Sequence, residues 1–440
     1  MKTIKYLLLL VVLLGTFSCH EEYTNPSALT EVQATGTVDG LISLVNGLQS
    51  RYSTSRACPI YNYVAGAGLT SRSLIVLNPG NTDEVQLEAG GSSVVGTNAI
   101  VRNLWEQSNI IKANADLVLS NVGIVADPGA RSGLLGGAAI FKALALGNLA
   151  MFWEQAPIEI VVNAPFASRE EVLNEAIRVL EEAEPLVAAN PIPASFYSKA
   201  VAGVDVPNSI NALIARYALM LGQYDKAIAA ANKVNLAVKS EFRFNPTNRN
   251  PVFDVAFGNE NVVRSRNLNM GLPASLAPVT ADARIDFYFA SRTSVDAPTG
   301  VPYYPDKGFY NSNSTSVPVY LPGEISLILA EAYARKDDLT NATTFLNAVL
   351  TKTAATDAWG IGANLPATTA TTKDDLLLEI YRNRCIELYL SGMILEDSRR
   401  FGRPGPLVSN PSSGDRNRNF YPYPANERDN NTNTPNDPAI

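Results

Sequence analysis

Histidine is almost absent from this chain: its 440 residues contain one, His20. His20 lies near the N-terminus, in a segment that we expect to be a flexible tether, so it is not a candidate for chemistry. A Ser-His-Asp or Cys-His catalytic apparatus, HExxH zinc chemistry and most histidine-built metal sites are therefore excluded. The motifs GxxxxGK(S/T), GxGxxG and GxSxG are also absent, and we predict no catalytic residue, metal or cofactor. A pair of glycosidase carboxylates stays open, because such a pair is defined in space.

The N-terminus has the pattern of an export signal. Two lysines precede an apolar run over residues 6–14, and a short stretch then leads to Cys19. The run is shorter than the roughly 20 residues of a spanning helix, so we predict a signal peptide over 1–18. Two glutamates behind the cysteine resemble the acidic tag of surface-exposed bacterial lipoproteins. We predict lipidation of Cys19, with 19–35 as anchor and tether; an ordinary signal peptide with an incidental cysteine stays open.

Cysteine is scarce in the rest of the chain, which is mildly acidic. Only Cys58 and Cys385 follow, outside any CxxC spacing. We expect two buried thiols; a single disulfide stays open, but a disulfide framework is excluded. Taking the two signal-peptide lysines from a formal charge of −7 leaves −9, and no long basic run occurs. Nucleic acid and anionic lipid head groups are therefore not expected as partners.

Apolar residues recur at the spacing of one helix face over several long segments. Residues 99–120 predict a long amphipathic helix, and residues 135–153, nearly all apolar, predict a buried one. Ser168-Arg-Glu-Glu171 is a capping box, which opens a further helix. A last amphipathic helix is predicted to start near Thr372.

Two other segments predict helical pairs. Residues 209–238 and 324–352 each contain two helix patterns around a short turn, with small and aromatic residues where the helices approach. The spacing resembles a tetratricopeptide repeat, although two ordinary helical hairpins stay open. Residues 240–320 lack a helical period and predict loops with a few short strands. Residues 401–440 are rich in Pro, Asn, Gly and Arg and predict an extended coil that lies on the helices or partly frays.

Several motifs, in the right order, resemble the SusD/RagB family of surface lipoproteins. The segment Asn383 to Arg400 is the most similar to a family pattern, which it matches at Arg384, Glu387, Leu388, Gly392, Asp397 and Arg400. The other segments that carry the resemblance are the helix with Trp105, Ile110 and Asn114, the turn Trp153-Glu-Gln-Ala-Pro-Ile158, and the tail Phe420-Tyr-Pro-Tyr-Pro-Ala-Asn-Glu427.

The charges in the most similar segment have a structural interpretation. Arg384 and Glu387 are one helical turn apart, as are Asp397 and Arg400, so we expect each pair to bond locally. We expect these charges to tie the last helix to the coil behind it. They are not placed in a binding site.

The resemblance implies a mainly α fold: a tetratricopeptide-like helical-pair scaffold with a loop-rich, irregular face and few short strands, in one domain over 36–440. It implies a non-enzymatic lipoprotein, anchored at the cell surface of the outer membrane, that captures an oligosaccharide or glycan. The partner it implies is a SusC-like TonB-dependent transporter. A surface glycosidase using two carboxylates, a structural or adhesion lipoprotein, and a peptide-binding member of the same family stay open.

Tyrosines among Pro, Gly and Asn are the candidate ligand-binding residues. Such rings are amphipathic and more often lie at the surface than tyrosines on a helix stripe do. In the family, the ligand face is built from loops between the early helices and from loops before the last helical pair. The segment with Tyr61 and Tyr63 falls in the first place, and the segment from Tyr303 to Tyr310 falls in the second. An alternative is that the rings only cover the helical body. The candidates are Tyr61, Tyr63, Tyr303, Tyr304 and Tyr310.

Overall fold

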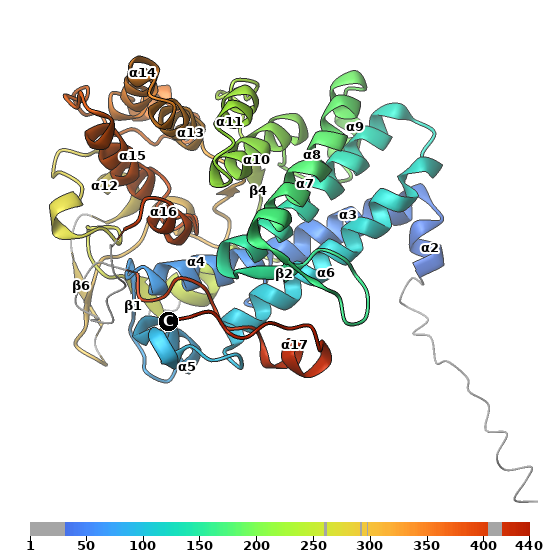
Figure 1. The fold of residues 1–440 in the computed structure, drawn as a ribbon, viewed down its shortest axis with the longest axis horizontal. Coiled ribbons are helices and arrows are strands. Elements are labelled where there is room, and N and C mark those ends of the chain that lie inside the picture. The colour runs from blue at the N-terminus through green and yellow to red at the C-terminus, as the bar shows by residue number, and fades with distance from the viewer. Residues whose placement is uncertain (1–30, 259–261, 291–292, 297, 404–415) are drawn as a thin grey trace, which may run out of the picture.

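The computed structural model describes residues 31–258, 262–290, 293–296, 298–403 and 416–440 (Figure 1). The predicted signal peptide, the lipidation site Cys19 and most of the predicted tether lie outside these residues. The fold is mainly helical, and its strands are two or three residues long. The fold class predicted from the sequence is therefore confirmed, whereas the domain boundaries stay a prediction.

The N-terminal half is a stack of long helices. The helices predicted over 99–120 and 135–153 are present as α6 (Ala99–Asn121) and α7 (Pro128–Phe152). In the described part of the chain, α7 is the one helix long and apolar enough to cross a membrane, but 94% of its apolar window is buried inside the protein. The other α-helices of this half are α2 (Glu31–Thr35), α3 (Val38–Ser53), α4 (Pro59–Thr70), α5 (Thr82–Ala89), α8 (Arg169–Ala189) and α9 (Ala194–Tyr197).

The capping box predicted at the start of α8 is present. The Ser168 hydroxyl accepts from the backbone N–H of Glu171, and the Glu171 carboxylate accepts from the backbone N–H of Ser168. Two otherwise unpaired backbone donors are thereby satisfied at the helix N-terminus.

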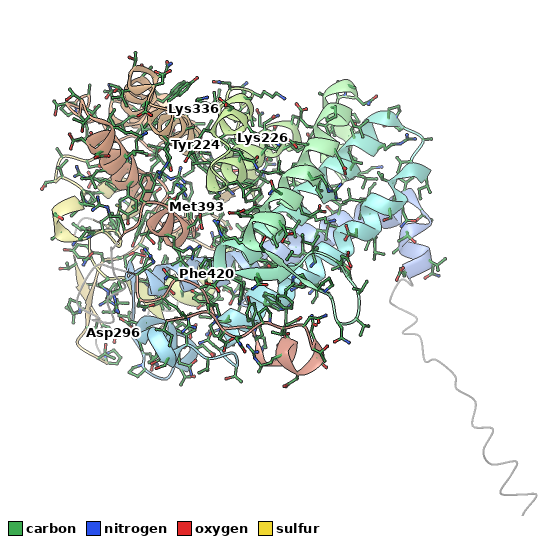
Figure 2. The ribbon with its side chains drawn as sticks, in the orientation of Figure 1. Tyr224, Lys226, Asp296, Lys336, Met393 and Phe420 are labelled. Atoms are coloured by element: carbon green, nitrogen blue, oxygen red, sulfur yellow. The ribbon has the colours of Figure 1, made fainter. Side chains whose placement is uncertain are left out.

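Both predicted helical pairs are present, with slightly different ends. The first consists of α10 (Val206–Met220) and α11 (Tyr224–Ala231), the second of α13 (Pro322–Arg335) and α14 (Leu339–Leu350). Gly222 turns the chain between α10 and α11 with a φ of +71°, where glycine carries no steric penalty. The two pairs meet where α11 packs on α13, and there Lys336 forms an ion pair with Asp225, next to Tyr224 (Figure 2).

The segment between the pairs is irregular, as predicted. Its helical turns include α12 (Arg284–Tyr288) and a π-helix (Phe253–Phe257). Every described strand belongs to an antiparallel two-stranded ladder. The ladders are β1 (Leu74–Val76) with β5 (Val263–Ser265), β2 (Gln155–Pro157) with β3 (Phe166–Ser168), β4 (Glu241–Phe242) with β8 (Val317–Pro318), and β6 (Ser294–Val295) with β7 (Pro302–Tyr303).

The C-terminal part packs on the second helical pair and on the N-terminal stack. Helix α15 (Lys373–Glu387) begins where predicted, with Thr372 accepting from the backbone N–H of Asp375. It is followed by α16 (Ile394–Arg400) and a coil with a short unpredicted helix, α17 (Ala425–Asn430). The coil lies on the helical body, as expected, and buries two tyrosine rings there. These are Tyr421 and Tyr423.

The predictions for the two cysteines and for the charges of α15 have different outcomes. Cys58 and Cys385 are free and buried, as expected. The local pair of Arg384 with Glu387 is wrong, because Glu387 bonds to Arg284 and Lys352 from other segments. The side chains of Arg384 and Glu387 are both buried. Each therefore pairs with the opposite charge that tertiary packing brings to it, and not with its neighbour on the same helix.

Candidate functional site

The candidate tyrosines near the N-terminus lie in a helix and not in a loop. Tyr61 and Tyr63 belong to α4, which starts with Pro59. Proline suits the first position of a helix, because its missing N–H has no intrahelical partner there. Tyr61 is 1% exposed, and its hydroxyl donates to the buried carboxylate of Glu84 at 2.8 Å. The surface position predicted for this segment is therefore wrong.

The three later tyrosines are also more buried than predicted. Tyr303 is 5% exposed, with the Arg264 guanidinium 5.5 Å from its ring centre. Tyr310 is buried, and its hydroxyl donates to the backbone carbonyl of Leu390 at 2.9 Å. Tyr304 alone among the five is partly exposed. The surface platform predicted from these rings does not form, and their ligand-binding role stays a prediction.

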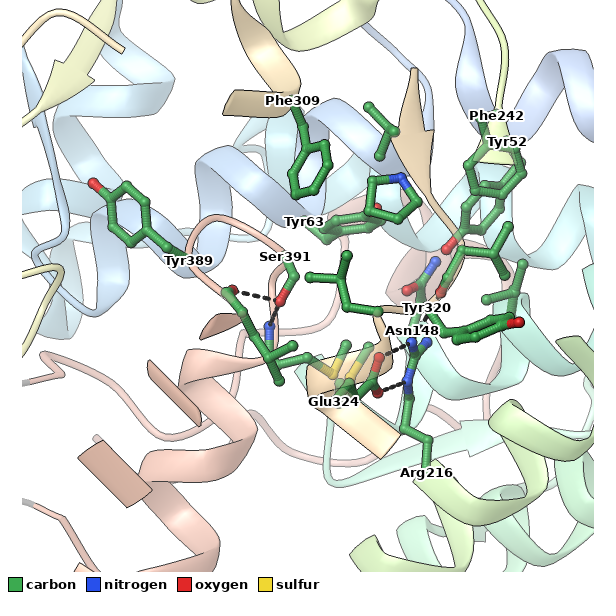
Figure 3. Close-up of a pocket in the computed structure, with 18 of the residues that line it drawn as sticks. Tyr52, Tyr63, Asn148, Arg216, Phe242, Phe309, Tyr320, Glu324, Tyr389 and Ser391 are labelled. Atoms are coloured by element: carbon green, nitrogen blue, oxygen red, sulfur yellow. Dashed lines mark hydrogen bonds and ion pairs between the residues drawn. The ribbon is translucent and has the colours of Figure 1, made fainter. Parts of the chain in front are cut away.

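Two of the five tyrosines line one internal cavity, the tyrosine cavity, shown in Figure 3. It offers about 50 Å³ to the centres of water-sized molecules. An apolar cavity of about 150 Å³ holds one benzene molecule, so the tyrosine cavity is too small for a sugar ring. Its aromatic lining consists of Tyr52, Tyr63, Tyr217, Phe242, Phe309, Tyr310, Tyr320 and Tyr389.

A buried ion pair lies at the wall of the tyrosine cavity. Arg216 donates to both carboxylate oxygens of Glu324, at 2.5 and 2.8 Å. Burial acts to lower the pKa of Arg216, but Glu324 outweighs it and the pKa is raised. Burial also raises the pKa of Tyr217 well above its usual range, so the phenol stays neutral. The cavity therefore has a neutralised, packed lining without a free acid or base among these groups.

A second, larger depression is open to solvent and lies beside the helical pairs. We call it the interpair groove. It offers about 730 Å³ to the centres of water-sized molecules, a volume typical of ligand sites. Its lining comes from the loop after α11, the start of α13, the end of α14 and the loop that follows α14: Leu236, Ala237, Pro322, Gly323, Ser326, Ala348, Thr351, Lys352, Ala355, Thr356, Asp357 and Ala358.

The floor of the interpair groove is a network of paired charges. Lys352 Nζ lies 2.7 Å from Asp357 Oδ2 and 2.7 Å from Glu387 Oε1. The other oxygen of Glu387 accepts from Arg284 at 3.1 Å. A Cβ atom at position 323 would lie 1.9 Å from Glu387 Oε1, so glycine is needed there. Among the described residues, no cluster of His, Cys, Asp and Glu could hold a metal ion.

The interpair groove was not predicted from the sequence. Its walls come from segments far apart in the chain, and Lys352 and Asp357 belong to no motif. The one signal that could have pointed to it is Trp359, a tryptophan in the loop before α15 that is partly exposed. The candidate tyrosines lie outside the groove lining.

The same fold occurs in solved structures of Bacteroides proteins. A SusD-like carbohydrate-binding protein from Bacteroides fragilis matches with a TM-score of 0.68 and 14% identity over 91% of this chain and 99% of its own. A SusD homologue from Bacteroides uniformis matches with a TM-score of 0.66 and 17% identity over 90% and 97%. A SusD-like carbohydrate-binding protein from Bacteroides vulgatus matches with a TM-score of 0.63 and 18% identity, over 82% of this chain and 83% of its own. No protein-family model and no curated protein matches the chain. The chain has the SusD fold that its sequence motifs predicted.

Proposed function

We propose that this protein is a lipid-anchored protein of the outer-membrane cell surface that captures an oligosaccharide or glycan and delivers it to a SusC-like TonB-dependent transporter. The observation that carries the proposal is the SusD fold over 91% of the chain, shared with a protein described as carbohydrate-binding. The export signal, Cys19 and the acidic residues behind it support the anchor. The helical pairs supply a rigid face on which a large partner can dock.

Binding without hydrolysis fits the interpair groove. A glycosidase of the usual kind needs two carboxylates on either side of the scissile bond, roughly 5 to 9.5 Å apart. Asp357 is the single carboxylate among the residues that line the groove, and it is paired with Lys352 at 2.7 Å. The nearest second carboxylate, Glu387, is fully buried beneath the groove and is paired with the same lysine at 2.7 Å. Two carboxylates held by one ammonium group support holding a sugar more than cleaving it.

A binding screen on residues 20–440 tests the proposal. The purified protein is screened against a glycan array and a peptide library, and each bound oligosaccharide is then incubated with the protein and analysed for products. We expect binding to at least one glycan and no shortening of it. Binding to peptides alone would make the ligand a peptide, and the absence of any soluble ligand would favour an adhesion role. Cleavage that is lost on changing one Asp or Glu would make the protein a glycosidase.

A further inference from the structure

The interpair groove and the tyrosine cavity differ mainly in size. The groove offers about 730 Å³ and the cavity about 50 Å³ to the centres of water-sized molecules. Several linked sugar rings need an open channel, because both ends of the chain continue beyond the bound part. The groove meets this requirement, and the cavity does not.

An aromatic ring adjoins one end of the groove. Ala237 and Ala358 line the groove from two different segments. These segments meet just beyond, where the Lys239 ammonium lies 4.9 Å from the centre of the Trp359 ring. The Trp359 ring also packs edge-on against Phe309, with 5.4 Å between ring centres, and stays partly exposed. Because Lys239 lies over one side of the indole, the part of the ring that stays exposed is the apolar surface left for the C–H face of a sugar.

The charge network under the groove leaves no unpaired cation for an acidic sugar, and Lys239, beyond the end of the groove, lies over the Trp359 ring. Lys352 and Arg284 are the cations, and Asp357, Glu387 and Asp282 are the carboxylates that bond to them. Two cations thus face three carboxylates. A uronic acid or sulfated sugar would have to compete with these buried pairs, and breaking such pairs is costly.

The rest of the lining matches a neutral sugar. The exposed Thr351 hydroxyl donates to a backbone carbonyl at 2.8 Å, so its lone pairs can accept from a sugar hydroxyl. Thr356 is also exposed, and its hydroxyl donates to the Thr353 carbonyl at 3.0 Å and accepts from the Thr353 backbone N–H at 3.3 Å. Leu236, 40% exposed, and Ala355 supply small apolar surfaces between them. Alternating hydroxyls and apolar patches are complementary to a sugar, whose hydroxyls edge apolar C–H faces.

We propose that the interpair groove is the ligand site and that it binds a neutral oligosaccharide, which stacks on Trp359 at the end of the groove. The proposal rests on the proposed function and names its site and its class of ligand. The proposed site is therefore different from the five tyrosines that were predicted from the sequence to bind the ligand.

Calorimetric titration of groove variants tests the proposal. The probes are hexasaccharides of glucan, xylan and mannan as neutral sugars, oligogalacturonate as the acidic sugar, and a mixed peptide library. Trp359→Ala removes the ring, and Ala355→Arg fills the groove from an exposed position, so it is informative even if the first variant folds poorly. Tyr197→Ala is the control, because Tyr197 is a partly exposed aromatic on α9, at the far side of the molecule from α14 (Figure 1).

The expected result is that one neutral hexasaccharide binds, and that both groove variants weaken it about 10-fold or more. The control should stay within about twofold of the wild type. Unchanged affinity in both groove variants would place the site elsewhere. A preference for oligogalacturonate or for peptides that the groove variants abolish would overturn the class of ligand. If the wild type binds no glycan on a full array, the proposed function itself fails, which is a different outcome from a glycan that binds outside the groove.

Discussion

Arg384 on α15 pairs with Asp397 on α16, with 3.0 Å between Nε and Oδ2, and not with Glu387 one turn along its own helix. Arg400 Nη2 bonds to Asp397 at 2.8 Å and also to Glu331 of α13 at 2.8 Å. The charges of the segment from Asn383 to Arg400, which is the most similar to the family pattern, therefore join the three helices α13, α15 and α16. Burial acts to raise the pKa of Glu331, but Arg400, Arg384 and Arg335 outweigh it and hold the pKa at about 2.

Removing the Glu331 charge should destabilise the protein strongly. In Glu331→Gln, buried Arg400 and Arg384 lose their shared carboxylate, and we expect a loss of about 3–5 kcal/mol in the free energy of unfolding. Because the folded pKa of Glu331 is lowered, its contribution is present above about pH 4.5 and is lost as the pH falls towards 2. Urea unfolding at pH 7 and at lower pH measures both effects.

A matched control for this experiment is Glu182→Gln. The Glu182 side chain is 65% exposed and pairs with Arg178 on the surface of α8, so its loss should cost less than about 1 kcal/mol. Equal, small losses in the two variants would show that the Glu331 cluster contributes little to stability.

Asp306 should make stability depend on pH in the opposite direction. Burial raises its pKa from 3.8 to about 7, although Ser265 donates to it from its hydroxyl and its backbone N–H. The folded state then binds the proton more tightly than the unfolded chain, so the free energy of unfolding falls as pH rises from about 4 to 7. Relative to Asp306→Asn, the wild type should lose up to about 4 kcal/mol over this range. Thermal unfolding at several pH values checks it.

Asp337→Asn is the control for the Asp306 series. The Asp337 side chain is 74% exposed, and asparagine tolerates its positive φ of 64°. Its pH profile should follow that of the wild type. If the profile of Asp306→Asn does so as well, Asp306 does not titrate in this range.

Cys19→Ala should release the protein from the membrane. Two or three acyl chains hold a protein on a bilayer almost permanently, and without them no anchor remains. Fractionation and labelling with palmitate measure this, and label should enter the wild type alone. Equal retention of both forms, with no label in either, would contradict lipidation of Cys19.

A large β-barrel protein should copurify with this protein from native membranes. The pairs α10–α11 and α13–α14 pack together through α11 and α13, and we expect this unit to dock on the transporter. Purification in several mild detergents, followed by mass spectrometry, identifies what is bound. An unrelated lipoprotein carrying the same tag is the control. Recovery of a lone monomer in every detergent would count heavily against the transporter.

The helices could be predicted because their signals are local. The apolar period of α6 and α7, the capping box at Ser168 and the turn at Gly222 act within a few residues. The position of Tyr61 could not be predicted in this way. Its segment was expected to be a loop, whereas Pro59 opens α4, and the burial of that helix depends on packing against α3, α5, α6 and α16.

The interpair groove could not be predicted from the sequence, for a different reason. Its floor needs Glu387 of α15 to meet Lys352 and Gly323, which are distant in sequence. Charge partners of this kind are set by tertiary packing, so spacing along the chain does not reveal them. The same reasoning explains why Arg384 was paired with the wrong carboxylate.

Uptake of a labelled oligosaccharide by living cells tests capture and delivery most directly. The glycan found in the binding screen is offered at a concentration near its Kd to cells that carry the wild type, no protein, or the Cys19→Ala form. We predict that uptake falls several-fold without the protein and is not restored by Cys19→Ala, because the ligand must be held at the membrane beside the transporter. Equal uptake in all three strains, with binding by the purified protein intact, would contradict the account.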